Sequence, residues 1–348
     1  MSDAEAGRPR PVWTFREYMQ PPDSDDVRAG DDSSVKKLHA SHFVGYRAFQ
    51  EKLARYIDPA TQLLDEKHVE FRSCPACGGG TARRMFTKNG GTYVKCLACT
   101  MVFTNPVFKD DVLIDYYNRN IDFNAVRHVN ELGFYTSISG KGLNLIARHR
   151  TPGTLLDVGS SDGLFLDVSK RHGWQSSGIE LNRAERELSV GKGHLVHSVE
   201  LRELPPHEKY DVITMWDVFE HIKSGESQLR EAAKRLGDGG LIFLQIPNSA
   251  SLAARILREK CHMFDGVEHV NLYSPHAIKV LCSRIGMEIL HFETVIDELK
   301  VIHNHLGYDD PYLGSFEPQP DLAFLSSELV LGSHSGYKMQ IVMRPSGD

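Results

Sequence analysis

Short apolar runs recur through the C-terminal half of this 348-residue chain, each about the length of a buried strand. The stretches between them carry apolar residues at helical spacing, so helices are expected to fill most of the gaps. Strands that alternate with helices in this way predict a doubly wound parallel sheet, that is, a Rossmann-like α/β fold with seven strands. The expected strands lie near 154–158, 176–180, 194–197, 210–216, 240–246, 288–294 and 338–344.

The rest of the chain divides into stretches of different pattern. Residues 1–32 are rich in Pro, Asp, Gly and Arg without periodicity, which predicts a flexible arm. An apolar stripe from Leu38 to Ile57, with Pro59 just beyond its expected end, predicts a helix within a helical segment, 33–69. A second helical stretch, 109–150, is expected to cap the main domain, 151–348. Residues 296–336 are expected to form an insertion before the last strand, of the kind that often shapes substrate specificity.

Residues 70–108 carry two C-x-x-C pairs separated by eighteen residues, Cys74 with Cys77 and Cys96 with Cys99. Each pair can form a tight turn whose two thiolates reach one ion, and two such turns complete a tetrahedral zinc site, as in a zinc ribbon. Four protein ligands leave no open position, so this zinc would be structural. Four reduced cysteines without metal are the alternative. Apart from one Glu at its start, the charged residues of this stretch are all Arg or Lys, so it could bind RNA or nucleotide phosphates, or present a solvated face.

Composition narrows the range of partners. The chain has 41% hydrophobic and 25% charged residues, a net charge of −6 and a pI near 6.3. These values are ordinary for a soluble globular protein and disfavour extended contact with nucleic acid or an acidic membrane. Neither a signal peptide nor an apolar run of about 18 residues is visible, so a cytoplasmic location is expected. Trp13, Phe15 and Tyr18 are expected to dock on the body of the protein or on a second copy, which would form a homodimer.

The first strand of the expected sheet leads into a glycine-bracketed turn, T-L-L-D-V-G-S-S-D-G over 154–163. A strand, a tight turn and a helix N-terminus form a cradle in which backbone N–H groups face a ligand. A dinucleotide fingerprint would need glycine at 161 and a small residue at 164, where Ser161 and Leu164 stand, and a phosphate loop would need G-K-[ST]. The pattern D-x-G-x-x-x-G fits better a cofactor that is held without phosphates.

The segment Asp157–Gly163 resembles the first motif of the class I S-adenosylmethionine-dependent methyltransferases. The resemblance implies that the turn approaches the methionine and ribose parts of S-adenosylmethionine. Glu180 closes the second strand, where an acidic residue accepts hydrogen bonds from ribose hydroxyls in dinucleotide folds. Glu200 is similar to an acidic residue that lies near adenine in this family. The implied cofactor-binding residues are Asp157, Gly159, Ser160, Ser161, Asp162, Gly163, Glu180, Leu181, Glu200, Leu201 and Asp217.

The fourth strand ends in D-V-F-E-H-I from Asp217, and a later segment reads E-H-V-N-x-x-S-P from Glu268. Both resemble motifs of a large methyltransferase subgroup, many of whose members methylate sugars, quinone precursors or other small hydroxyl compounds. His221 and His269 are candidates for the general base that removes the acceptor proton. In a second version Asp217 and Glu220 join both histidines as a site for Mg²⁺, Mn²⁺ or Zn²⁺, sharing one face with His221 if a helix starts at 217. In a third, these residues only hold their loops in place.

The resemblance therefore implies an S-adenosylmethionine-dependent methyltransferase that O-methylates a hydroxyl of a sugar, glycan or secondary metabolite. Two enzymatic alternatives stay open: a C-methyltransferase of a nucleotide-linked sugar, and an RNA methyltransferase whose ribbon holds RNA. Only about fifty residues follow the sixth strand, which is short for the further C-terminal domain of the first, and the acidic pI disfavours the second. A binding protein that keeps the fold without catalysis is the non-enzymatic alternative.

Overall fold

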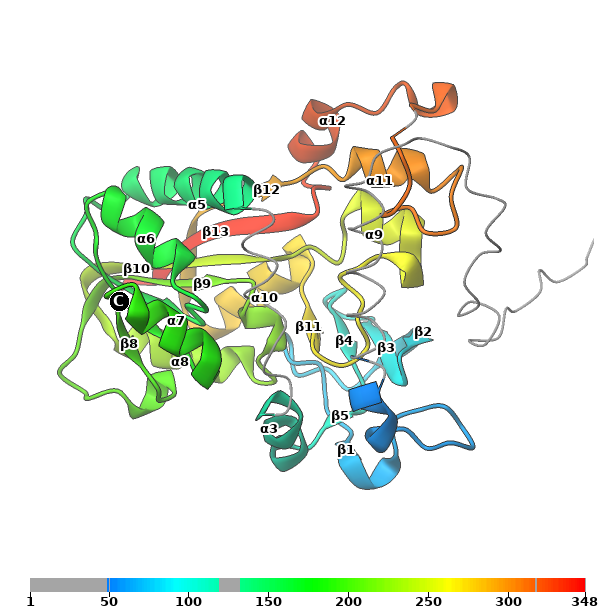
Figure 1. Ribbon diagram of the computed structural model, residues 1–348, viewed down its shortest axis with the longest axis horizontal. Coiled ribbons are helices and arrows are strands. Elements are labelled where there is room, and N and C mark those ends of the chain that lie inside the picture. The colour runs from blue at the N-terminus through cyan, green and yellow to red at the C-terminus, as the bar shows by residue number, and fades with distance from the viewer. Residues whose placement is uncertain (1–48, 50, 119–131, 317, 348) are drawn as a thin grey trace, which may run out of the picture. The chain divides into compact units, whose positions relative to one another are not determined.

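The computed structural model contains three β-sheets within its described residues. They are a seven-stranded sheet, a four-stranded sheet and a two-stranded sheet (Figure 1). The expected arm, 1–32, and parts of the two expected helical segments, 33–48 and 119–131, lie outside the described residues. No described helix is both long and apolar enough to cross a bilayer. The described residues are 49, 51–118, 132–316 and 318–347.

The large sheet contains strands close to all seven predicted positions, which confirms the doubly wound, Rossmann-like fold. Across the sheet their order is β12-β13-β10-β9-β6-β7-β8. β13 is antiparallel to both of its neighbours, and the other pairs are parallel. The bounds are β6 (Thr154–Val158), β7 (Gln175–Ile179), β8 (Leu195–His197), β9 (Tyr210–Trp216), β10 (Leu236–Pro247), β12 (Met287–Val295) and β13 (Lys338–Pro345).

The order of the strands reverses between β6 and β9. The chain moves outward from β6 to β7 and β8, and then returns to place β9 on the other side of β6. In open parallel sheets, ligands bind at the carboxyl ends of the strands that flank such a reversal. A site is therefore expected where the segments that follow β6 and β9 meet.

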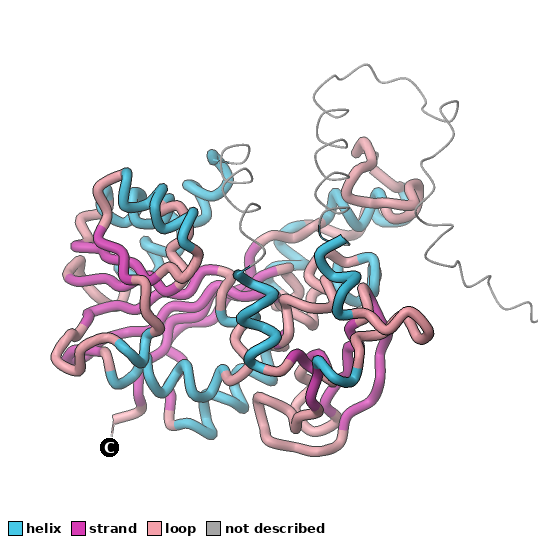
Figure 2. The backbone as a smooth tube through the Cα atoms, turned by 60° about the horizontal axis from the view of Figure 1, so that its bottom comes forward, coloured by secondary structure: helices cyan, strands magenta, loops and turns pink. Residues whose placement is uncertain are grey.

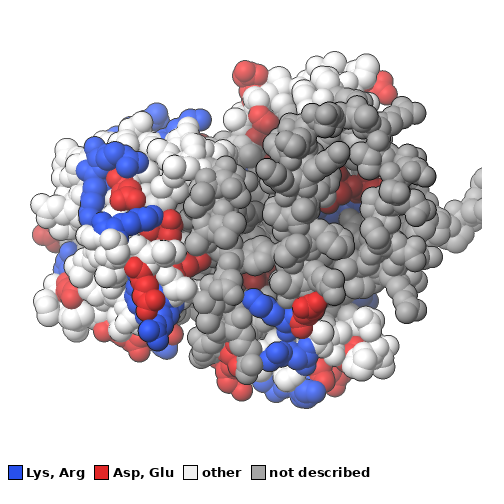
Figure 3. Space-filling view, in the orientation of Figure 1, with Lys and Arg blue, Asp and Glu red and all other residues white. Residues whose placement is uncertain are grey.

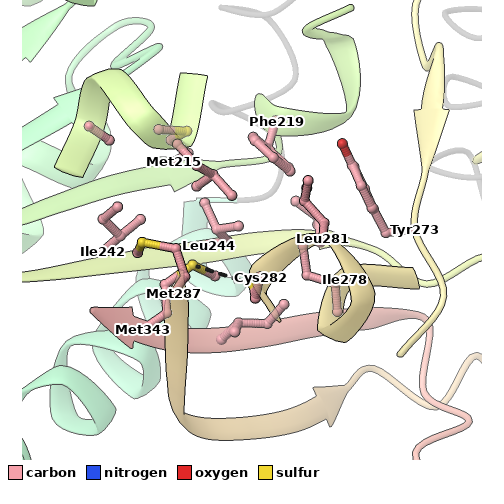
Figure 4. Packing of buried hydrophobic residues seen from close by; sticks show 14 of the residues in the cluster. Met215, Phe219, Ile242, Leu244, Tyr273, Ile278, Leu281, Cys282, Met287 and Met343 are labelled. Carbon is pink, nitrogen blue, oxygen red and sulfur yellow. Dashed lines mark hydrogen bonds between the residues drawn. The ribbon is translucent and has the colours of Figure 1, made fainter. Parts of the chain in front are cut away.

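The residues of the central strands point alternately to the two faces of the sheet and build two cores. Phe243 of β10 packs with α5 and α6 on one face, whereas its neighbour Leu244 packs with α8 and α10 on the other (Figure 1). Figure 4 shows the second core, in which the Cys282 thiol of α10 contacts the Met343 sulfur of β13. Burial on both faces explains why the central strands read as continuous apolar runs. The helices are α5 (Leu132–Ala147), α6 (Leu164–Arg171), α7 (Arg183–Gly191), α8 (Gly225–Lys234), α9 (Leu252–Leu257), α10 (Pro275–Ile285), α11 (Leu299–Asn304) and α12 (Ser327–Gly332).

Three strands of the four-stranded sheet belong to the cysteine-bearing segment 70–108, called the ribbon below, and the fourth, β11, comes from the main domain. Figure 2 shows the short strands of this sheet beside those of the large sheet. The ribbon shares its core with the main domain, because Met101 and Phe103 lie in the same buried cluster as Leu244. Arg284 of α10 also donates to the Ala76 carbonyl of the ribbon at 3.1 Å. The strands are β2 (Ala82–Lys88), β3 (Gly91–Cys96), β4 (Val102–Thr104) and β11 (Asn271–Leu272); β1 (Val69–Glu70) pairs with β5 (Val107–Phe108), and α3 (Asp110–Asn118) follows.

The helical segment expected up to residue 69 ends earlier in the structure. Its described part is helical as far as Tyr56, Ile57 then forms an isolated β-bridge with Leu64, and one short 3-10 turn, Glu66–His68, follows. Pro59 lies in the turn between Ile57 and Leu64, and a proline drives the residue before it out of the helical conformation. The helix therefore ends where the apolar stripe stops, just before Pro59, and only the wider bounds of the segment, up to residue 69, were too long.

Asp211 lies near the start of β9, at the amino ends of the parallel strands. We expect it to be a main contributor to the stability of the fold there. Its carboxylate accepts hydrogen bonds from Thr154 N at 2.8 Å and Thr154 Oγ1 at 3.0 Å, and pairs with Arg150. We expect Asp211→Asn to lower the free energy of unfolding by about 1–3 kcal/mol at pH 7, measured by urea denaturation. Asp321→Asn, which changes an exposed carboxylate, is the matched control.

The same pair should show a defined pH dependence. Hydrogen bonds from the Thr154 backbone, followed by the Arg150 side chain, lower the pKa of Asp211 below its usual value. A carboxylate with a depressed pKa in the folded state stabilises the protein above the unfolded pKa, and this contribution is lost as the pH falls through the folded pKa. The difference between wild type and Asp211→Asn should therefore close below about pH 4. Equal unfolding free energies at pH 7 would contradict this role.

Candidate functional site

The turn after β6 depends on backbone conformations that few residues adopt. Gly159 has φ +79°, and a Cβ there would lie 2.4 Å from Cγ2 of Val218, so only glycine fits. The turn after β6 thus packs directly against the segment after β9. Ser161 has φ +49°, a left-handed conformation that is uncommon for a residue other than glycine and tends to occur at functional sites.

Glu180, directly after β7, turns its carboxylate towards this same turn. Its two oxygens accept hydrogen bonds from Ser161 N at 2.9 Å and Asn182 N at 2.7 Å. Arg186 donates to the backbone carbonyl of Glu180 at 2.9 Å, and no ion pair of the carboxylate is found within the described part of the chain. Burial raises the pKa of Glu180. Each carboxylate oxygen can accept more than one hydrogen bond, so Glu180 can still bind hydroxyl donors such as those of a ribose.

Asp157 is also buried, with 1% of its surface exposed. Its Oδ1 accepts a hydrogen bond from Thr214 Oγ1 at 2.6 Å, and burial raises the pKa of Asp157 to about 8. Thr214 stands opposite Asp157 in the parallel pairing of β9 with β6. Thr214 belongs to no recognisable motif of the sequence, and only the register of β9 against β6 identifies it as the partner of Asp157.

The other residues expected to bind the cofactor fall into two groups. The hydroxyl oxygens of Ser160 and Ser161 are buried and have no hydrogen-bond partner among the described residues, which suits a polar ligand in this turn. In the second group, two acidic residues are already paired: Asp162 with Lys192 at 2.9 Å, and Glu200 with Arg202 at 2.9 Å. Of the two leucines, Leu201 is buried and Leu181 is exposed. The cofactor roles given to these residues stay predictions.

The segment after β9 and the segment before β11 meet in a cluster of three side chains. Glu220 and His221 lie in the short 3-10 helix η4 (Phe219–His221), and His269 comes from residues 265–270, called the His269 loop below. Each of the three offers one ligand atom, and these atoms all lie within 4.8 Å of one another. The imidazole centroids of His221 and His269 are 4.7 Å apart, with the rings nearly perpendicular.

Glu220 makes this cluster electrostatically unusual. Its side chain is 1% exposed, and neither carboxylate oxygen has a hydrogen-bond partner within the described ranges. Burial, with a further effect of Asp217, raises the pKa of Glu220 to about 8. Burial and the neighbouring His269 lower the pKa of His221 to about 3. A buried carboxylate without a partner is costly, whereas a carboxylate and two imidazoles together suit a divalent cation.

The orientation of His269 is set by hydrogen bonding. Its Nδ1 donates to the Met263 carbonyl at 2.8 Å and lies 3.4 Å from Asp265 Oδ2. Burial acts to lower the pKa of His269, but Asp265, Glu220 and the Met263 carbonyl outweigh it, and the pKa is raised. Because Nδ1 carries the donated proton, Nε2 is the atom that can accept a proton or bind a cation in the neutral ring.

Asp217 does not join the cluster in the way the sequence suggested. It has φ +54°, so no helix starts there, and the 3-10 helix begins only at Phe219. The Asp217 carboxylate forms an ion pair with Lys338 of β13 and accepts a hydrogen bond from Gln245 Nε2 at 3.3 Å. The structure therefore brings together three of the four residues expected to hold a cation. Lys338 was missed because it lies in the last strand and belongs to no motif.

The four ribbon cysteines come together as the spacing predicted. The Sγ atoms of Cys74 and Cys99 are 3.5 Å apart, and those of Cys77 and Cys96 are 3.6 Å apart. Four thiolates at about 2.3 Å from a tetrahedral zinc would be separated by about 3.8 Å. The four thiols therefore fit one zinc ion with little adjustment, and they are too far apart for disulfides.

Both cysteine turns have the same backbone geometry. Gly78 N donates to the Cys74 carbonyl at 2.8 Å, and Thr100 N donates to the Cys96 carbonyl at 3.1 Å. Gly78 and Thr100 both adopt positive φ, at +76° and +64°. Two equivalent turns facing each other provide the pair of knuckles that a zinc ribbon requires.

The basic residues of the ribbon are partly used inside the protein. Lys88 donates to the Cys261 carbonyl at 3.4 Å, and Arg72 donates to three backbone carbonyls. On the face drawn in Figure 3, the Lys and Arg side chains of the described residues are interspersed with Asp and Glu. These contacts reduce the number of ribbon cations available to RNA or to nucleotide phosphates.

Comparison with known proteins identifies the main domain. Residues 134–292 match the family model described as a methyltransferase domain. This segment is a methyltransferase domain. A ubiquinone biosynthesis O-methyltransferase of Leptothrix cholodnii is 26% identical over 39% of this chain and 65% of its own length. The mitochondrial ubiquinone biosynthesis O-methyltransferase of Candida albicans is 31% identical over 27% of this chain and 32% of its own length. The resemblance to class I methyltransferases is confirmed, although the chain spans less than two thirds of these relatives.

An S-adenosylmethionine-dependent methyltransferase from Clostridium acetobutylicum superimposes with a TM-score of 0.43 and 10% identity, over 65% of this chain and 99% of that one.

The ribbon geometry predicts one tightly bound zinc per chain. Cys96→Ser should reduce the zinc content measured by elemental analysis from about one ion per chain to nearly none, because three thiolates leave the tetrahedral site open. Cys282→Ser, which changes a buried cysteine outside the ribbon, should keep the zinc. A wild-type protein that is folded and free of metal would overturn the assignment.

Glu180 should be essential for binding S-adenosylmethionine. Glu180→Ala removes a charged acceptor at the turn after β6. The dissociation constant of this variant for S-adenosylmethionine, measured by calorimetry, should be about 10- to 100-fold higher than that of the wild type. Glu187→Ala is the control, because Glu187 lies exposed on α7 and its carboxylate pairs only with the exposed Arg183 among the ion pairs of the described residues. Unchanged affinity in Glu180→Ala would exclude Glu180 from the cofactor site.

Proposed function

We propose that the protein is an S-adenosylmethionine-dependent O-methyltransferase that acts on a hydroxyl group of a small molecule. The methyltransferase domain supports the reaction type, and the relatives of this domain are named O-methyltransferases. The observation that carries the proposal is the Glu220–His221–His269 cluster, in which Glu220 is buried and the two histidines are partly buried, and whose first two members lie just after β9. Val218, two residues before Glu220, packs on the glycine turn after β6. The expected cofactor turn and the cluster are thus neighbours.

The chemistry required of the protein is limited, because the methyl group of a sulfonium is already activated. The protein must align the acceptor oxygen with the S–CH₃ bond and exclude water. As the O–CH₃ bond forms and the CH₃–S bond breaks, the hydroxyl proton must leave. Nε2 of His269 is the acceptor for that proton, because Nδ1 is held by Met263. General base catalysis of this kind contributes about 10²–10⁴-fold to the rate.

The carboxylate of Glu220 has no hydrogen-bond partner among the described residues, and this favours a version with a divalent cation. Glu220, His221 and His269 would hold Mg²⁺, Mn²⁺ or Zn²⁺, and such an ion binds a hydroxyl and lowers its pKa. Asp217 is left out of this ligand set because Lys338 neutralises it. With the cation, the two imidazoles serve as ligands; without it, His269 serves as the base.

The acceptor is expected to be a hydroxyl of a sugar, glycan or secondary metabolite. A screen of such compounds with methyl-labelled S-adenosylmethionine, read by mass spectrometry, should give a product methylated on oxygen. Product methylated only on carbon, or only on RNA, would replace this proposal with one of the two alternatives named above.

With an acceptor identified, His269→Gln should lower kcat by about 10²–10⁴-fold and leave the affinity for S-adenosylmethionine unchanged, because it removes only the proton acceptor or ligand. His276→Gln, an exposed histidine on α10, is the control and should behave like the wild type. Equal loss of cofactor affinity and kcat in His269→Gln would point to a structural role instead.

A chelator distinguishes the two versions. If the cluster holds a cation, activity should fall on chelation and return with Mg²⁺ or Mn²⁺, while the ribbon zinc measured in parallel stays bound. If His269 acts alone, activity should survive chelation, and Glu220→Gln should keep most of it.

A further inference from the structure

The four-stranded sheet of the ribbon is completed by a strand that follows His269 in the chain. β11 pairs antiparallel with β4, so that Asn271 stands opposite Phe103. Thr104 N, at the end of β4, also donates to the Val270 carbonyl at 3.0 Å. The residue after His269 is thereby bonded directly to the ribbon.

Side chains and backbone of the ribbon hold the His269 loop on its other side. The Tyr93 hydroxyl of β3, which is fully buried, donates to the His269 carbonyl at 3.2 Å and accepts from Gly266 N at 3.0 Å. Asn89 Nδ2 donates to the Asp265 carbonyl at 2.8 Å. Gly91 approaches so closely that a Cβ there would lie 1.7 Å from the Gly266 carbonyl oxygen. The loop is therefore held to the ribbon by both backbone and side-chain contacts.

Arg72, two residues before the first zinc-site cysteine, connects three segments with one guanidinium. Nη2 donates to the Val270 carbonyl at 2.7 Å, next to His269. Nη1 donates to the Lys223 carbonyl at 3.1 Å, two residues after His221, and Nε donates to the Thr104 carbonyl of the ribbon at 3.3 Å. Burial lowers the pKa of Arg72 to about 10, which still leaves it charged at neutral pH.

The same two segments are joined a second time by Asn271. Its Nδ2 donates to the Ile222 carbonyl at 2.6 Å and to the Lys223 carbonyl at 3.2 Å. The carbonyls that follow His221 and His269 are thus bound by donors from the ribbon and from its fourth strand. A planar guanidinium with its N–H groups in a fixed fork sets the distances between carbonyls more strictly than an ammonium does.

We propose that Arg72 is a positioning residue that sets the separation of His221 and His269 by binding the backbone beside each of them to the ribbon. The ribbon then acts as a scaffold for the candidate catalytic cluster, and its contribution needs no contact with the substrate. The catalytic meaning of this role rests on the function proposed above, but the role itself is a matter of geometry and can be tested without any acceptor.

The test is nuclear magnetic resonance of the full-length, zinc-loaded protein with isotope-labelled histidine. The wild type should show a nuclear Overhauser cross-peak between ring protons of His221 and His269, assigned with His221→Gln and His269→Gln, because the ring centroids are 4.7 Å apart. In Arg72→Ala the cross-peak should be lost, and added guanidinium below its unfolding concentration should restore it. Arg72→Lys should weaken the cross-peak, since one ammonium cannot reproduce the fork.

Zinc content and affinity for S-adenosylmethionine serve as measures of the intact fold and should stay at the wild-type level in both Arg72 variants. Arg83→Ala, an exposed arginine on β2 of the same ribbon, is the matched control and should keep the cross-peak. An unchanged cross-peak in Arg72→Ala would overturn the proposal. Loss of the cross-peak together with zinc or cofactor binding in both Arg72 variants would also overturn it, because Arg72 would then support the whole fold. Failure of the acceptor screen would leave these outcomes untouched and would count only against the proposed function.

Discussion

The parallel pairing of β6 with β9 is the constraint on which the rest of this structure depends. The two strands lie side by side in register, with Leu155 opposite Val212 and Asp157 opposite Thr214, and the sheet reverses its order between them. Because parallel strands end at the same edge, the turns that follow them are forced together. One result is the close approach of Val218 to residue 159, where only glycine can be accommodated.

Three carboxylates are buried near this edge of the sheet: Asp157, Glu180 and Glu220. Burial raises the pKa of each of them, because it disfavours the charged form of the carboxyl group. Buried acids with shifted pKa values are characteristic of functional sites, where a group that is unfavourable for folding is retained because it binds a ligand. Any ligand that supplies hydroxyl donors to Glu180, or a cation to Glu220, offsets part of this effect of burial, and its binding therefore stabilises the fold.

The strands could be predicted from the sequence, whereas several contacts between distant segments could not. Strands buried on both faces must be apolar throughout, and tight glycine turns have few alternatives, so both features leave local patterns. The ion pair of Asp217 with Lys338 spans 121 positions, and the hydrogen bond of Arg72 with Val270 spans 198. No local pattern records such partners. Arg72 therefore looked like one cation of a basic patch, and Asp217 looked like a ligand, until the topology placed their neighbours.

β11 lies far along the chain from β4, the ribbon strand with which it pairs, and this separation affects the order of folding. The four cysteines lie between residues 74 and 99, so all four thiols are available to a metal ion soon after the ribbon leaves the ribosome. The open edge of β4, however, has no partner until Asn271 and Leu272 have been made. During that interval the nascent chain exposes an unpaired strand edge, the kind of surface that pairs with other chains. The ribbon can therefore begin to fold first, but it must finish last, together with the domain whose histidine it holds.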